Sequence, residues 1–158
     1  MMKDNNDINV LDIACYVINY SRVICRKEIS NFILNKLLYC IQKACLKEYN
    51  KPLFEEDIVA WKNGPSIPEA WFEHCYWGGM PIQSEDIVNI NLFSDKDREI
   101  IENTIDKYID VKSIQWFNLF SEKNLNTVWS RVYNGGKGYN KTLPPKLIKG
   151  EQEFVFDE

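Results

Sequence analysis

Apolar residues recur at intervals of three and four in the first third of the chain, the spacing of one buried helical face. Asn9 can cap a first helix with the apolar positions Val10, Leu11, Ala14, Val17 and Ile18. Ser30 can cap a second and stronger helix, which Pro52 stops near Tyr49-Asn50. Its apolar face comprises Leu34, Leu37, Leu38, Ile41, Ala44 and Cys45. Three of its lysines lie largely off this face, and we expect them to be solvated: Lys36, Lys43 and Lys47.

The pattern changes after the second helix. Residues 57–61 have the β-branched and aromatic content of a short strand, and residues 62–65 are typical of a turn. Ser66 and Glu69 have the spacing of a capping box, which opens a helix that Gly78-Gly79 would end. We expect the extended stretch 80–91 to pair with the earlier strand.

The remainder of the chain predicts further helices. Ser94 can cap a helix in which Ile101, Ile105 and Tyr108 share one face. Two shorter aromatic-rich helices are expected over 114–120 and 127–133, and a last helical turn near 142–145. The fold class is therefore mainly α (α+β), a compact bundle of about six helices with a short β-hairpin or small antiparallel sheet. We expect one domain over residues 1–158, with an acidic C-terminal tail at 151–158.

Composition and charge narrow the functional classes. The 158 residues are 45% hydrophobic, enough for one well-packed domain, and no stretch approaches the ~20 apolar residues of a membrane span. The polar N-terminus is unlike a signal peptide. The net charge of −4 conceals a strong segregation of basic from acidic residues along the chain. Residues 129–150, for example, hold five basic and no acidic side chains. Such segregation can steer a charged partner, although solvated faces are its commoner meaning.

Residue types give little support to catalysis. The five cysteines have no Cys-x-x-Cys spacing, which favours thiols in a cytoplasmic protein. His74 is the only histidine, and we expect it at the end of a surface helix. The Gly135-Gly136-Lys137-Gly138 loop lacks the spacing of a phosphate-binding loop. We predict no catalytic residue, no metal ligand and no cofactor.

Three segments together carry a resemblance to a known family. One segment lies in the helix that Ser30 caps. Another forms the predicted strand, turn and following helix start, and the last lies near residue 130. Their residues are Lys36, Leu37, Leu38, Tyr39 and Gln42; Ala60, Trp61, Lys62, Gly64, Pro65 and Pro68; and Trp129 and Arg131. This order resembles the Panacea domain, also described as the phage-associated GepA-like family, over about residues 10–148. Asn63 departs from the pattern, since an aromatic residue is common there.

The resemblance implies a mostly helical domain that binds and neutralises a cognate toxin without chemistry of its own. Candidate partner-binding residues are Tyr39, Trp61, Asn63, Trp71, Tyr76 and Trp77. Core packing explains Tyr39 and Trp61 equally well, because large aromatic residues dominate both cores and interfaces. The oligomeric state stays open.

Two other functions remain open at this point. A phage-encoded inhibitor or adaptor of a host protein could use the same surface. A nucleic-acid-binding protein could use the basic blocks 22–51 and 129–150, although the overall acidity disfavours it. No membrane insertion is expected.

Overall fold

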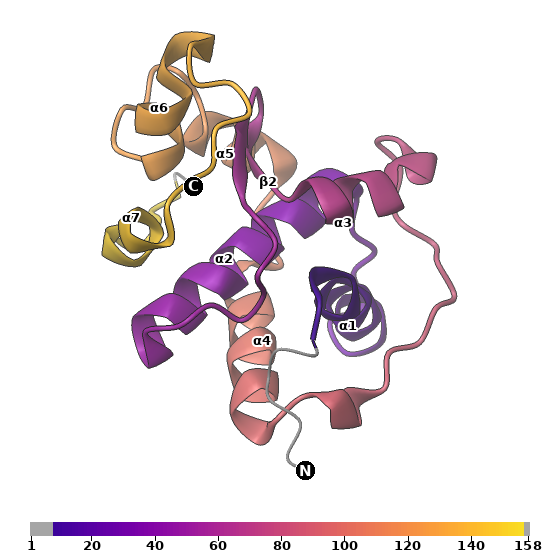
Figure 1. Ribbon diagram of the computed structural model, residues 1–158. Coiled ribbons are helices and arrows are strands. Elements are labelled where there is room, and N and C mark those ends of the chain that lie inside the picture. The colour runs from indigo at the N-terminus through magenta and orange to yellow at the C-terminus, as the bar shows by residue number, and fades with distance from the viewer. Residues whose placement is uncertain (1–7, 157–158) are drawn as a thin grey trace.

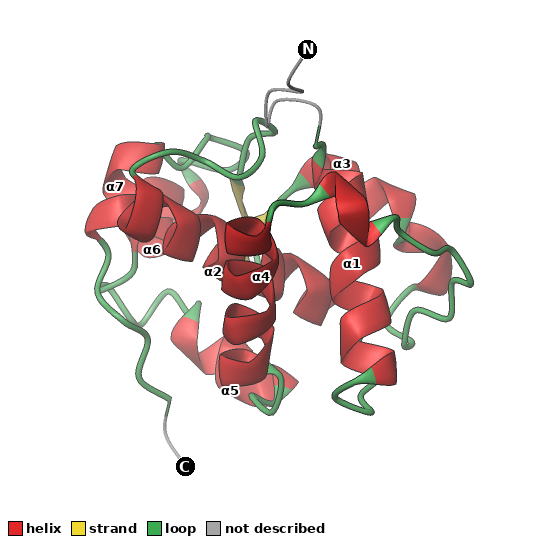
Figure 2. Cartoon of the chain, turned by 90° about the horizontal axis from the view of Figure 1, so that it is seen from below, coloured by secondary structure: helices red, strands yellow, loops and turns green. Residues whose placement is uncertain are grey.

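The computed structural model describes residues 8–156. The second helix of the chain, α2 (Asn31–Tyr49), crosses the middle of the molecule (Figure 1). Helices α1 (Val10–Val23) and α4 (Asp95–Tyr108) pack on one side of it. The hairpin and helices α5 (Ser113–Leu119), α6 (Val128–Tyr133) and α7 (Pro145–Gly150) gather on the other side. Figure 2 shows this division from below, with α6 and α7 at one end and α1 at the other.

Seven α-helices and one small antiparallel sheet occur within residues 8–156, which confirms the mainly α fold class. The remaining elements are β1 (Val59–Trp61), β2 (Gly64–Ser66) and α3 (Pro68–Glu73). Three 3-10 turns complete the structure: η2 (Cys75–Trp77), η3 (Ile90–Leu92) and η4 (Asn134–Gly136).

The predicted helix caps at Asn9, Ser30 and Ser94 are confirmed. The Asn9 side chain accepts from the Asp12 backbone N–H, and Asp12 reciprocates. Ser30 and Ser94 accept in the same way from the third residues of α2 and α4. Asn50 ends α2 in the left-handed conformation, with φ of 57°, as its position before Pro52 suggested.

The hairpin joins β1 and β2 in antiparallel register, with Trp61 opposite Gly64. The predicted pairing of residues 80–91 with this strand is wrong. Residues 140–143 take that edge instead, because the Asn140 N–H donates to Ala60 O and the Leu143 N–H to Ile58 O, both at 2.8 Å. The chain after α3 pairs instead with the residues just before α2, where the Ile82 N–H donates to Ile29 O.

The capping box predicted at Ser66 is also absent. Ser66 belongs to β2, and Ile67 occupies the N-cap position of α3 without a side-chain cap. Pro68 provides the first helical turn instead, since a proline there needs no N–H partner.

Helix α2 is buried on nearly all sides, which corrects the expectation of solvated lysines. Lys36 is 1% exposed and Lys43 is 4% exposed, whereas Lys47 is exposed as expected. The reason is that α1, α3, α4, α5, α7 and β2 all contact α2, so few of its faces reach solvent. Burial of a polar side chain in such a helix is costly unless its polar group forms a hydrogen bond or an ion pair.

The C-terminal segment 151–156 follows the core closely. Glu151 is buried, and Phe154 and Phe156 pack against Trp116 with ring centres 6.4 and 4.9 Å away. The first part of the predicted acidic tail therefore belongs to the packed body of the protein. Residues 157–158 of that tail lie outside the described residues.

Candidate functional site

Two of the sequence motifs meet where α2 faces the hairpin. The Lys36 ammonium donates to the Pro65 carbonyl oxygen at 3.0 Å. Gly64 has a φ of +118°, and a Cβ atom there would lie 2.9 Å from Lys36 Cε and 3.0 Å from Phe120 Cγ. Glycine is required at this position because it allows both the left-handed backbone and the close approach of the lysine.

Other motif residues also hold the hairpin in place. The Gln42 side chain donates to Phe54 O and accepts from the Leu53 N–H, both at 2.8 Å, which ties the segment before β1 to α2. The Trp129 indole N–H donates to Trp61 O at 2.7 Å and connects α6 to the hairpin. Leu37, Leu38 and Ala60 lie fully in the core. These residues therefore position a surface rather than form one.

Tyr39 does not belong to a binding surface. Its side chain is completely buried, and its hydroxyl donates to Glu151 Oε1 at 2.6 Å. The prediction of Tyr39 as a partner-binding residue is therefore wrong, and its alternative reading as core is confirmed. Packing of the C-terminal segment over α2 accounts for this burial.

Three of the predicted partner-binding residues come together around a small surface cavity of about 220 Å³, which we call the hairpin hollow. Those three are Trp61, Asn63 and Trp71. The other residues that line the hollow are Phe32, Lys36, Lys62, Ser66 and Tyr139. Phe32 and Tyr139 come from the start of α2 and from the loop after α6, so only the tertiary structure brings them to the hairpin.

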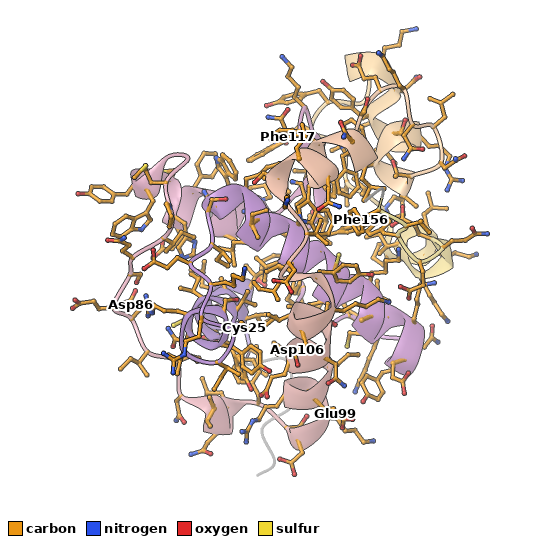
Figure 3. The ribbon with its side chains drawn as sticks, turned by 180° about the vertical axis from the view of Figure 1, so that it is seen from behind. Cys25, Asp86, Glu99, Asp106, Phe117 and Phe156 are labelled. Carbon is orange, nitrogen blue, oxygen red and sulfur yellow. The ribbon has the colours of Figure 1, made fainter. Side chains whose placement is uncertain are left out.

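Aromatic rings surround this hollow and remain accessible. Trp61 makes edge contacts with Trp71 and Phe72, at ring-centre distances of 6.2 and 6.0 Å. Phe72 is 65% exposed, and Tyr139 is 60% exposed. Phe32 stacks at a ring-centre distance of 4.4 Å on Phe117 of α5, which is labelled in Figure 3.

Tyr76 and Trp77 form a separate pair. They lie in η2 beyond α3, with ring centres 5.1 Å apart, and neither lines the hairpin hollow. Tyr76 is 86% exposed, whereas Trp77 is half-buried against the core. They form a second aromatic location distinct from the hollow.

A sequence model of the family described as "Antitoxin SocA-like, Panacea domain" matches residues 34–130, more than half of the chain. The chain belongs to this family. No curated protein and no solved structure matches it. The matched part of the Panacea domain begins within α2 and ends within α6, so it contains the hairpin and most of the residues around the hollow.

Charge is divided across this Panacea domain. Lys62, Arg131, Lys137 and Lys141 are exposed on and next to the hairpin. Acidic residues such as Asp86, Glu99 and Asp106 lie toward the other end of the molecule from Phe117 (Figure 3). The basic residues late in the sequence therefore lie beside the hairpin, next to the aromatic hollow.

His74 is buried at the C-terminal end of α3, with Nδ1 2.8 Å from Ala70 O. It ends a helix as predicted, but the expected surface position is wrong, because His74 is buried beside α1. Among residues 8–156 there is no cluster of three or more His, Cys, Asp or Glu side chains able to hold a metal ion. In the same part of the chain, no helix is long and apolar enough to cross a membrane.

Burial lowers the pKa of Lys36 to about 7, because the charged ammonium loses most of its hydration. The Phe32 ring, whose centre is 4.5 Å from Nζ, and the Pro65 carbonyl replace that hydration only in part. The Cys40 thiol on the next turn of α2 is the titratable neighbour, and burial raises its own pKa.

We predict that Lys36 makes stability depend on pH near neutrality. Its pKa is about 7 when folded and about 10.4 when unfolded, so the unfolded chain binds more protons between these values. The free energy of unfolding should therefore rise from pH 6 to pH 8.5, by about 2 kcal/mol more in the wild type than in a Lys36→Met variant. Urea unfolding of both proteins measures this difference, because thiol titration is common to both. Parallel pH profiles would contradict it.

Proposed function

We propose that this Panacea domain is an antitoxin that neutralises a toxin protein by binding it directly through the hairpin hollow. The observation that carries the proposal is a set of accessible aromatic side chains around a hollow that the family-motif residues hold in place. The hollow presents aromatic rings and lysines, an arrangement suited to binding without catalysis.

Aromatic residues of this kind are effective anchors in protein interfaces. They bury a large area, and they lose little conformational entropy when their positions are already restricted. Trp61 is restricted on several sides, because its indole N–H donates to Asn140 Oδ1 at 2.9 Å and its ring contacts Trp71 and Phe72. A partner would therefore meet a preorganised surface.

A cytoplasmic location and a protein partner complete the proposal. All five cysteines lie within the described residues as free thiols, as expected in a reducing compartment. The alternative partner is a host protein bound by a phage-encoded inhibitor. The same surface would serve, but no neighbouring gene would then encode a toxin.

We predict that Phe72→Ala and Tyr139→Ala each weaken toxin binding by ten-fold to a hundred-fold. Truncating an interface aromatic anchor removes about 1.4–2.7 kcal/mol of binding free energy, and both side chains are exposed enough for the fold to tolerate the change. The reading frame next to this gene would be expressed alone and together with the antitoxin, with growth as the readout. Binding of the two purified proteins gives the affinities.

Ile87→Ala is the matched control, since Ile87 is 88% exposed on the segment that precedes α4. Tyr76→Ala tests the second aromatic location. The hairpin hollow is supported if only the first two variants lose affinity, and it is rejected as the interface if Tyr76→Ala alone does. An adjacent product that does not arrest growth would reject the antitoxin function, and recovery of a host protein by the purified chain would favour the inhibitor.

A further inference from the structure

The hairpin hollow contains a buried ammonium group whose hydrogen-bonding capacity is mostly unused. Lys36 is 1% exposed, and it lines the hollow together with Phe32 and Ser66. Within residues 8–156, its Nζ donates to one acceptor, Pro65 O at 3.0 Å. An ammonium carries three N–H donors, so two have no hydrogen-bond acceptor among these residues.

The groups that face this ammonium from the neighbouring elements carry no negative charge. Helix α2 contributes Phe32 and the Cys40 thiol, the hairpin contributes the Pro65 carbonyl, and Phe120 approaches from the end of α5 at 5.9 Å. A second cation, Lys62, also lines the hollow and is exposed. Lys43, two helical turns further along α2, does have a carboxylate partner in Glu151 at 3.2 Å. Lys36 thus differs from the other buried lysine of the same helix.

We propose that the hairpin hollow receives a glutamate or aspartate side chain from an acidic segment of the partner protein, whose carboxylate binds Lys36 Nζ. The proposal deepens the proposed function, because it names the chemistry that the partner presents at the same surface. The side-chain methylenes of the bound residue would contact the Trp61 and Trp71 rings, and the carboxylate would complete the ammonium's hydrogen bonds. Charge-assisted hydrogen bonds of this kind are short and strong where water is excluded.

The size and polarity of the hollow favour a protein side chain over other anions. Its volume of about 220 Å³ is below the roughly 300–1,000 Å³ of pockets that enclose small molecules and cofactors. A nucleic acid would place its phosphates along exposed cations, such as Lys62 and Lys141, rather than at the bottom of an aromatic hollow. The basic surroundings would also attract an acidic segment before it docks.

The test uses the purified full chain and two short probes, acetyl-Phe-Glu-amide and acetyl-Phe-Gln-amide. Binding is followed by NMR of the tryptophan indole N–H groups and of ¹³C-labelled lysine Cε. We expect the Glu peptide to perturb Trp61, Trp71 and Lys36 saturably and to raise the pKa of Lys36. The Gln peptide should bind at least ten-fold more weakly.

The pH dependence identifies the lysine involved. Because Lys36 loses its proton near pH 7, affinity for the Glu peptide should be about ten-fold weaker at pH 8 than at pH 6. Lys36→Met should abolish the difference between the Glu and Gln peptides, while its urea unfolding curve shows that it is folded. Lys47→Met, an exposed lysine of the same helix that does not line the hollow, is the matched control and should preserve both the preference and the pH dependence.

Each other outcome overturns the proposal. Equal binding of the two peptides, or a preference that survives Lys36→Met, would show that no carboxylate binds Lys36. Tight binding of a single-stranded oligonucleotide that Lys36→Met leaves unchanged would assign the basic surface to nucleic acid instead. No toxin is present in these titrations, so their result is independent of whether an adjacent toxin is neutralised.

Discussion

Replacing Glu151 with glutamine will lower the free energy of unfolding by about 3–5 kcal/mol. The Glu151 carboxylate is 4% exposed and accepts three hydrogen bonds, from the Tyr39 hydroxyl at 2.6 Å, Lys43 Nζ at 3.2 Å and the Val128 N–H at 2.7 Å. Glutamine retains one acceptor oxygen, and its amide N–H₂ group would face at least one of these donors. The Lys43 ammonium would then be buried without a counter-charge.

The coupling between Glu151 and Lys43 can be measured separately. Burial is the largest cause that lowers the pKa of Lys43, and Glu151 acts against it by stabilising the charged form. Lys43→Met alone should therefore also be strongly destabilising, since it leaves a buried carboxylate unpaired. The double variant should lose less stability than the two single variants together, with a difference of at least 1 kcal/mol.

Urea unfolding at pH 7 measures all three variants. The matched control is Glu153→Gln, two residues further along, whose ion pair with Lys107 is exposed to solvent on both sides. Pairs of this kind contribute about 0–1 kcal/mol. If Glu151→Gln were as mild as Glu153→Gln, the buried network would not be what holds the C-terminal segment to α2.

Gly64→Ala should lower the free energy of unfolding by about 3–5 kcal/mol. The backbone φ of +118° is unfavourable for a residue with a Cβ, at about 1–3 kcal/mol. The new methyl group would also lie 2.9 Å from Lys36 Cε and 3.0 Å from Phe120 Cγ, and overpacking of a buried site costs about another 1–3 kcal/mol. We expect the hairpin to move away from α2 and the hollow to open.

Substitutions at two other glycines separate the contribution of backbone strain from that of overpacking. Gly135 has a φ of +65° with no atom within 4 Å of a Cβ, so Gly135→Ala measures backbone strain alone, at about 1 kcal/mol. Gly79 has neither a positive φ nor a neighbour within 4 Å, and Gly79→Ala should have little effect. Equal losses for Gly64→Ala and Gly135→Ala would show that contact with Lys36 is unimportant.

The two networks explain how the family motifs support one surface. Lys36 and Gly64 join α2 to the hairpin, whereas Tyr39 joins α2 to Glu151. Glu151 lies beyond the matched residues 34–130. A residue outside the matched region therefore accepts the hydrogen bond of the motif tyrosine Tyr39 inside it. Segment 151–156 is thus part of what stabilises the Panacea domain in this chain.

Local sequence signals were sufficient for much of the fold. The caps at Asn9, Ser30 and Ser94 and the end of α2 near Asn50 follow from hydrogen bonds within four residues, which the sequence shows directly. The partner of β1 could not be identified in this way. Residues 80–91 have extended character in the sequence, whereas a helical turn is expected near 142–145, although α7 begins only at Pro145 and Thr142 bridges to Val59. The partner of β1 depends instead on where α3 and α6 direct the chain.

The sequence by itself determined the mainly helical class, the family and the absence of Cys-x-x-Cys pairs. Only the tertiary structure decided which motif residues are buried and which line a surface hollow. Tyr39 and Lys43 became core because the C-terminal segment covers them, and Lys36 and Trp61 came to share a hollow with Tyr139. Helical periodicity records which positions share one face, but burial on every side of α2 depends on elements far away in the sequence.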